Sequence, residues 1–235
     1  MLTFPLYLAS SCNSGPPRFF FPLFFGFILL FIGIVVVALL TEKKRTKAFM
    51  LLSSKYGFRF EKNPADDIVK ELNYFSLFKR GRSKKVYNVI SMTKDNVSWK
   101  VFDYRYATGS GKNSSIHNQT VALQQIANLK LPFFSITPES FFHRIGDVFG
   151  YSDIDFDEYP EFSKNYFLKG SDEEEIRKLF SKDVIRYFEQ EKNIINIEAA
   201  GDVILVYKPS KRIKPVELSS FMKKAEEVVS VFHKK

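Results

Sequence analysis

Residues 19–40 read FFFPLFFGFILLFIGIVVVALL, a run of 22 positions without a charged side chain. An α-helix rises about 1.5 Å per residue, so roughly 20 apolar residues are needed to cross the ~30 Å hydrocarbon core of a bilayer. Pro22 falls in the expected first turn, where its missing N–H costs the helix nothing. A core helix of a soluble protein is rarely this long and apolar on every side. The run therefore predicts a single transmembrane helix, which places the chain in the cell membrane.

Two cleavable signals are alternatives to a retained helix. A secretory signal peptide has a basic start, an apolar core of about 7–15 residues and a small-residue cleavage site. Only Arg18 precedes the long run, and no Ala-x-Ala pattern closes it. A lipoprotein signal ending at Cys12 would have a short apolar core with no basic residue before it. We therefore expect the helix to be retained.

The flanks of the run predict its orientation. Basic residues follow the run at once, namely Lys43, Lys44, Arg45 and Lys47. Before the run there is only Arg18. By the positive-inside rule, residues 1–18 lie outside the cell and the C-terminal side lies in the cytoplasm. Residues 41–56 contain good helix formers, and we expect them to continue the helix as a basic juxtamembrane segment.

Residues 57–235 are enough to bury a hydrophobic core, as one domain or as two subdomains divided near residue 150. The formal net charge is +9, and all basic residues but Arg18 follow the predicted membrane helix. A positive domain beside the cytoplasmic leaflet is attracted to anionic lipid headgroups by about 1 kcal/mol per basic residue. Nucleic acid is an alternative partner that the charge alone does not favour. The single cysteine, Cys12, excludes an internal disulfide and a cysteine-based zinc site.

The pattern after residue 57 predicts an α+β fold. Val86–Met92 and Val97–Tyr106 alternate in polarity around a polar turn, which indicates a β-hairpin. A second hairpin is expected over residues 194–208, around Ala200-Gly201-Asp202. The terminal segment Val216–His233 has one apolar face, typical of a helix that covers a core. Meandering strands and short helices without β-α-β alternation favour an antiparallel sheet with several short helices.

Three motifs occur in a familiar order. The first is VFDYRY at 101–106 with TGSGK at 108–112, the second is LPFFSITPE at 131–139, and the third is DIDFD at 153–157 with YPEFS at 159–163. Together they resemble a group of bacterial and archaeal proteins of unknown function, described only as hypothetical or membrane proteins. The resemblance covers roughly residue 56 to the C-terminus. It implies an intact domain and a prokaryotic source, and it transfers no catalytic residue.

A basic segment at residues 79–85 is the main candidate for a membrane-surface site. Phe75 and Phe78 precede this expected loop, so aromatic and basic groups would meet the headgroups together. A solvated basic turn is the alternative. With the juxtamembrane residues, the predicted membrane-surface set is Lys43, Lys44, Arg45, Lys47, Lys79, Arg80, Arg82, Lys84 and Lys85.

A second candidate site is acidic. Asp153, Asp155 and Asp157 alternate with Ile154 and Phe156, so a strand here would put the three carboxylates on one face. Carboxylate oxygens are ligands for Ca²⁺ or Mg²⁺. The spacing does not fit an EF-hand, and like charges on one face also discourage edge-to-edge pairing of sheets. A metal site and a solvated edge are therefore both open.

These patterns favour a single-pass membrane protein whose cytoplasmic domain binds a partner protein or the membrane surface and does no chemistry. They indicate no catalytic residue and no cofactor, and they do not identify the partner. One alternative is a membrane-tethered, metal-dependent enzyme of unfamiliar type that uses carboxylates within residues 153–161. The other is a nucleic-acid-binding domain held at the membrane.

Overall fold

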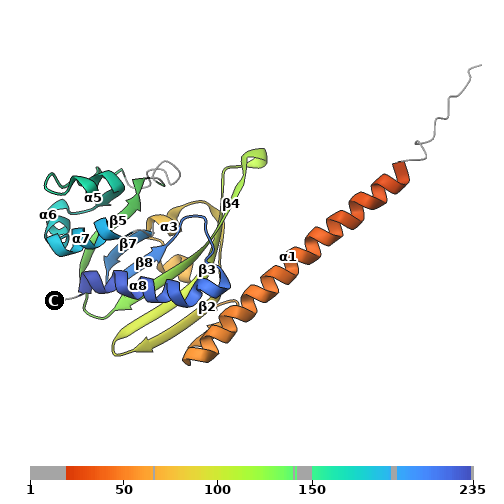
Figure 1. Cartoon of the computed structure of the whole chain (residues 1–235), viewed down its shortest axis with the longest axis horizontal. Coiled ribbons are helices and arrows are strands. Elements are labelled where there is room, and N and C mark those ends of the chain that lie inside the picture. The colour runs from red at the N-terminus through yellow and green to blue at the C-terminus, as the bar shows by residue number, and fades with distance from the viewer. Residues whose placement is uncertain (1–19, 66, 140, 142–149, 192–194, 234–235) are drawn as a thin grey trace, which may run out of the picture. The chain divides into compact units, whose positions relative to one another are not determined.

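The computed structural model describes residues 20–65, 67–139, 141, 150–191 and 195–233 (Figure 1). The helices are α1 Phe20–Tyr56, α2 Ile68–Glu71, α3 Ser76–Lys79, α5 Pro160–Asn165, α6 Glu173–Leu179, α7 Lys182–Gln190 and α8 Leu218–His233, with 3-10 turns η1 Gly111–Asn113 and η2 Pro215–Glu217. The strands are β1 Arg59–Glu61, β2 Arg82–Lys94, β3 Val97–Thr108, β4 Ser115–Ile126, β5 Leu131–Pro138, β6 Tyr166–Gly170, β7 Asn196–Gly201 and β8 Val203–Tyr207.

The chain divides into two compact units, residues 1–44 and residues 45–235. The boundary falls inside α1, which is one continuous helix as the sequence predicted. The first part of α1 is long and apolar enough to cross a membrane, and its large apolar side chains from Phe24 to Leu40 are exposed. By length and composition it is a candidate membrane span.

The folded unit is built on one antiparallel sheet of eight strands, in the order β1-β2-β3-β4-β8-β7-β5-β6. The predicted α+β class is confirmed. Both expected hairpins are present, β2–β3 and β7–β8. Asp95 and Asn96 form the first turn with positive φ angles of 49° and 64°, the backbone that a tight hairpin requires. Strands from both sides of residue 150 belong to this sheet.

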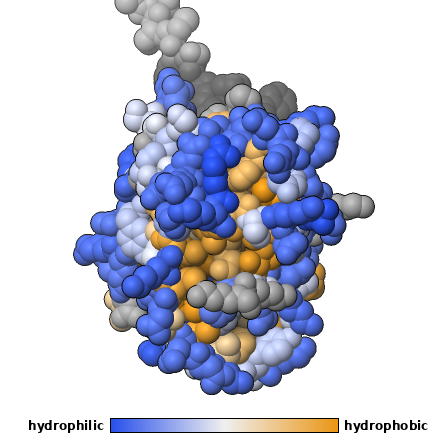
Figure 2. Space-filling view, turned by 90° about the vertical axis from the view of Figure 1, so that its left-hand side faces the viewer, coloured by the Kyte–Doolittle hydropathy of each residue, from blue (hydrophilic) through white to orange (hydrophobic). Residues whose placement is uncertain are grey.

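Helices cover both faces of the sheet. On one face, α2 and α3 bury Ile68, Phe75 and Phe78 against β3 and β4. On the other face, α8 and α5–α7 enclose a larger core that also takes Phe49 from the end of α1. On the side of the domain where α6, α7 and the end of α8 lie, apolar surface is visible between hydrophilic residues (Figure 2).

Candidate functional site

The folded unit begins at a buried arginine. Arg45 in α1 is 6% exposed and faces Asp103 of β3, which is fully buried. The guanidinium donates two hydrogen bonds to this carboxylate, from Nε to Oδ2 at 2.7 Å and from Nη2 to Oδ1 at 2.6 Å. Such a bidentate pair fixes orientation as well as distance. It therefore holds the C-terminal part of α1 on the face of the sheet.

Other polar groups complete this buried network. Asp103 also accepts hydrogen bonds from Thr120 Oγ1 and Asn88 Nδ2, each at 3.1 Å. Arg45 Nη1 donates to the carbonyl oxygen of Ile213 at 2.6 Å, which brings in the segment between β8 and α8. A buried charge pair is tolerated when its remaining donors and acceptors are satisfied. The network thus joins α1, three strands and the β8–α8 connection.

This burial corrects one residue of the predicted membrane-surface set. Arg45 was expected to meet lipid headgroups, but its guanidinium points into the sheet. A carboxylate placed 58 positions away in the sequence is the cause, and no local pattern reveals it. The side chains of Lys43, Lys44 and Lys47 are exposed.

The segment 79–85 is not the basic loop that the sequence predicted. Lys79 ends α3 and Arg82 begins β2, with Gly81 between them in the left-handed region at φ +64°. Lys84 Nζ donates to the carbonyl oxygen of Phe78 at 2.6 Å, so this cation stabilises the turn itself.

The predicted residues of this segment differ in exposure. Lys79, Arg82 and Lys85 are exposed, whereas Arg80 and Lys84 are half-buried. Phe75 and Phe78, which were expected to dock on headgroups, are 0% exposed and belong to the core. Leu77 N in α3 donates a hydrogen bond to the buried carboxylate of Glu198 in β7 at 3.1 Å, which holds α3 on the sheet. Burial raises the pKa of Glu198, and the hydrogen bond from the Tyr207 hydroxyl opposes that rise.

The acidic candidate site is also corrected. Residues 153–157 form no strand, so the alternation that was expected to place the three carboxylates on one face is absent. Asp153 Oδ1 accepts hydrogen bonds from Leu168 N at 2.9 Å and from Ile154 N at 3.0 Å, while Asp155 and Asp157 are exposed. Across the described ranges, no three His, Cys, Asp or Glu side chains gather as a metal would need. Asp153 is a structural acceptor that joins its loop to β6.

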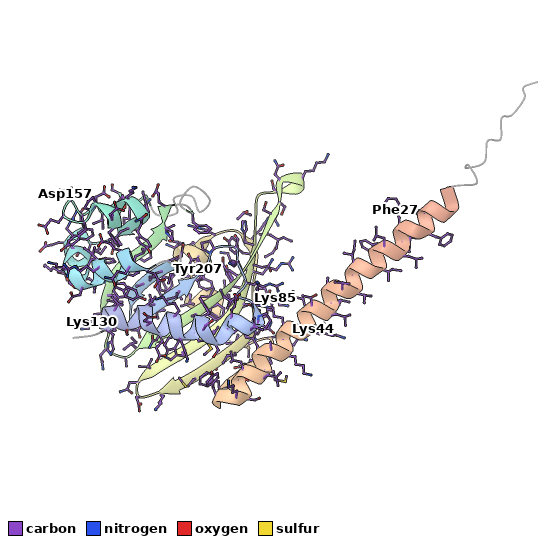
Figure 3. The ribbon with its side chains drawn as sticks, viewed as in Figure 1. Phe27, Lys44, Lys85, Lys130, Asp157 and Tyr207 are labelled. Carbon is purple, nitrogen blue, oxygen red and sulfur yellow. The ribbon has the colours of Figure 1, made fainter. Side chains whose placement is uncertain are left out.

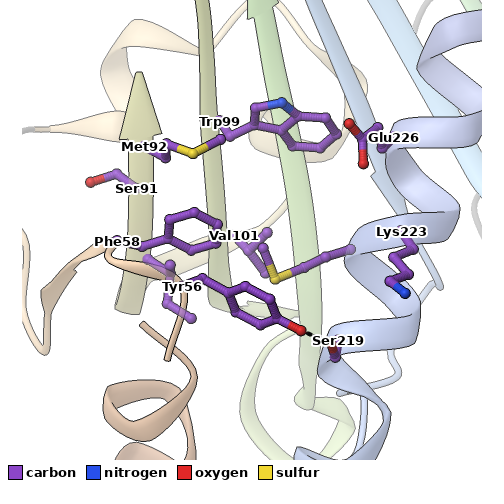
Figure 4. A pocket seen from close by; sticks show the side chains of 11 residues that line it. Tyr56, Phe58, Ser91, Met92, Trp99, Val101, Ser219, Lys223 and Glu226 are labelled. Atoms are coloured by element: carbon purple, nitrogen blue, oxygen red, sulfur yellow. Dashed lines mark hydrogen bonds between the residues drawn. The ribbon is translucent and has the colours of Figure 1, made fainter. Parts of the chain in front are cut away.

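A hollow lies between α8 and the first strands of the sheet (Figure 4). Its volume is about 220 Å³. We call it the α8 groove, and it is lined by Tyr56, Phe58, Ile90, Ser91, Met92, Trp99, Val101, Ser219, Met222, Lys223 and Glu226.

Both walls of the α8 groove follow from secondary-structure periodicity. Trp99 and Val101 are two residues apart on β3, so both point to the α8 side of the sheet. On α8, Ser219, Met222 and Glu226 recur at the spacing of one helix face. The sequence predicted the apolar face of α8, but it did not predict that Tyr56 and Phe58 would close the groove.

The rim of the α8 groove is polar and carries both signs of charge. The Tyr56 hydroxyl and Ser219 Oγ share a hydrogen bond at 2.8 Å, which ties the end of α1 to the start of α8 (Figure 4). Lys223 and Glu226 lie at the edge, one helical turn apart. The interior is apolar and includes two methionines, Met92 and Met222, whose flexible side chains adapt to different occupants. This arrangement suits binding of an apolar group, with orientation set by the rim.

No family model and no curated protein matches the sequence. Among solved structures, the fold is similar to the crystal structure of the mycobacterial trehalose monomycolate transport factor A, TtfA. The TM-score is 0.57, the sequence identity is 8%, and the match covers 80% of this chain and 96% of that chain. At this identity the likeness concerns the fold, and a shared fold does not by itself transfer a function.

Proposed function

We propose that this chain is a single-pass membrane protein whose domain 45–235 is a binding module at the cytoplasmic membrane surface, with no chemistry of its own. The observation that carries the proposal is the α8 groove, an apolar hollow in the same unit that holds the end of the anchor helix. Its occupant is the apolar face of a segment from a partner protein, in the manner of a helix in a groove.

Size supports a protein segment as the occupant. Pockets for cofactors and small ligands usually have volumes of roughly 300–1,000 Å³. The α8 groove, at about 220 Å³, suits one or two inserted side chains better than a whole small molecule. Buried side-chain anchors of this kind dominate the energy of many protein interfaces.

Charge at the rim supports the same occupant. Lys223 and Glu226 present opposite charges one turn apart, which complement the mixed charges flanking an apolar stripe on a partner helix. A site for an anionic lipid would instead place basic groups alone at the mouth. The solved structure with this fold is named a transport factor, which is compatible with an accessory role and does not carry the argument.

The sole tryptophan allows a direct test, because Trp99 lines the α8 groove. The full chain in detergent would be titrated with a short amphipathic helical peptide that lacks tryptophan and has leucines on one face. We expect a saturable change in Trp99 emission that a scrambled peptide of equal composition does not give. Met222→Glu should weaken peptide binding at least about tenfold, since it puts a charge among apolar side chains.

Met50→Glu is the matched control, because Met50 is 49% exposed and does not line the α8 groove. If dodecanoate gives the saturable response and the peptide gives none, the occupant is a lipid chain and the proposal fails. It fails as well if Met222→Glu and Met50→Glu bind the peptide equally.

A further inference from the structure

A basic surface surrounds the point at which α1 joins the sheet. Lys85 of β2 and Arg105 of β3 are directly paired and both exposed. They lie two residues along from the pair Tyr87–Asp103, so they share the sheet face on which Arg45 binds Asp103. One step of two residues is about 7 Å, so both cations lie close to the buried network.

The segment between β8 and α8 adds cations to the same surface. Lys211 and Lys214 are exposed. Their backbone is fixed, because Thr120 N donates to Lys211 O at 3.3 Å and Ile213 N donates to Thr120 Oγ1 at 3.0 Å. The carbonyl oxygen of Ile213 accepts from Arg45 Nη1 at 2.6 Å. The segment is therefore held by the same arginine that begins the folded unit.

An apolar side chain projects beside these cations. Val216 in η2 is 88% exposed, the largest exposed fraction among the large apolar side chains of the described residues. Glu217 is the neighbouring acid, and its carboxylate lies 3.8 Å from Lys214 Nζ. An exposed apolar residue that follows closely on basic residues is the combination that interfacial segments insert between headgroups.

The chain itself limits how far this surface can be from a membrane that holds the apolar run. Arg45 follows Leu40 by five residues. Five residues span about 8 Å as a helix and at most about 18 Å when fully extended. Because these residues belong to the continuous helix α1, the shorter span applies, and it is about one Debye length, within which anionic lipid attracts cations.

We propose that Lys85, Arg105, Lys211, Lys214 and Val216 form a second membrane contact, the tether-side surface, which binds the phosphate groups of anionic lipids. This inference rests on the part of the proposed function in which α1 spans the membrane, and it is independent of the α8 groove. It replaces the predicted aromatic-basic loop, whose phenylalanines are buried. The surface orients the domain on the bilayer and leaves the α8 groove for a partner protein.

The test uses the full chain in lipid nanodiscs of phosphatidylcholine, with or without phosphatidylglycerol. An environment-sensitive dye is attached at Val216→Cys in a Cys12→Ser background. We expect a blue shift of the dye with phosphatidylglycerol that high salt reverses. Inorganic phosphate added to phosphatidylcholine discs should give no such shift. The reference label is at Lys130→Cys, because Lys130 and Lys85 lie far apart in the domain (Figure 3).

Charge variants complete the test. Lys211→Gln with Lys214→Gln should lower the docked-to-free ratio by about fivefold per lysine. The control is Lys94→Gln with Lys130→Gln, which removes the same charge from exposed sites remote from Arg45.

Equal shifts with both lipids, or equal losses in both double variants, would overturn the inference. A shift with free phosphate alone would identify a soluble anion as the ligand. Entry of the chain into nanodiscs checks the membrane span, and Trp99 titration checks the α8 groove, so failure of the proposed function is seen separately.

Discussion

Among single residues, Asp103 offers the clearest test of what holds the fold together. It is fully buried and accepts four hydrogen bonds, two from Arg45 and one each from Thr120 and Asn88. Asp103→Ala leaves a buried guanidinium without its counter-ion, which costs about 3–5 kcal/mol. We expect the melting temperature to fall on the order of 10 °C. Thermal unfolding of the full chain in detergent is measured by the emission of Trp99.

The control for that prediction is Glu174→Ala. Glu174 lies in α6, where its carboxylate is 2.8 Å from Lys178 Nζ and both side chains are largely exposed. Exposed pairs of this kind contribute about 0–1 kcal/mol. Equal melting temperatures for the two variants would show that the Arg45 network does not hold the fold.

The burial of Asp153 makes the stability of the fold depend on pH. Burial raises the pKa of Asp153 to about 6, partly opposed by the backbone N–H groups of Leu168 and Ile154 and reinforced by Asp155. A carboxyl group whose pKa is higher in the folded chain favours folding below about pH 4, and this contribution is lost as the pH rises through about 6. Asp153→Asn keeps the oxygen that both N–H groups use and removes the charge.

We therefore expect the melting temperature of Asp153→Asn, relative to the unchanged chain, to increase from pH 4 to pH 6 and then to level off. Asp157→Asn is the control, because it removes the same charge from an exposed position of the same segment. A difference that stays constant across this range would contradict the role of burial at Asp153.

At the scale of elements, the sequence predicted what depends on local pattern. Alternation and the polar turn at 93–96 located the β2–β3 hairpin, and periodicity located α8. It did not predict α3, because Phe78 packs against Phe102 and Tyr104 of β3, and Phe75 is buried in the same core. A short aromatic and basic stretch has the same local sequence pattern whether it is buried against such a strand or exposed to solvent.

Gly81 tests the turn that replaces the predicted loop. An added Cβ would meet the carbonyl oxygen of Ala107 and come within 2.8 Å of the Tyr106 ring, at a φ of +64°. Gly81→Ala should therefore destabilise the fold by about 2–4 kcal/mol, from left-handed strain together with overlap. Gly57→Ala has a similar φ of +70° but no atom within 4 Å, so only the strain of about 1 kcal/mol is expected. Thermal unfolding of both variants compares them, and equal losses would remove the overlap from the explanation.

At the scale of the whole molecule, the candidate sites depend on long-range order that periodicity does not contain. The strand order places β8 beside β4 and β7 beside β5, neither of which are neighbours in sequence. The α8 groove joins residues 56–101 with residues 219–226, and the tether-side surface joins β2 and β3 with the segment before α8. The sequence supplied the chemistry of each part, and the sheet brings the parts together.

The basic residues on either side of the apolar run predict the orientation of the chain in the membrane. Lys43, Lys44 and Lys47 follow the apolar run closely, whereas only Arg18 precedes it. The orientation of a membrane helix is set by these charges before the domain folds. Arg45 therefore still counts among the basic residues after the apolar run, although it is buried in the folded state. A reporter active only in the cytoplasm, fused after Lys235, should work, and one active only after export should not. If the exported reporter works instead, the domain faces outward and the tether-side surface meets the outer leaflet.

Replacing Lys43, Lys44 and Lys47 by Gln while adding lysines before Arg18 should reverse the reporter result, because the excess of positive charge then lies on the other side.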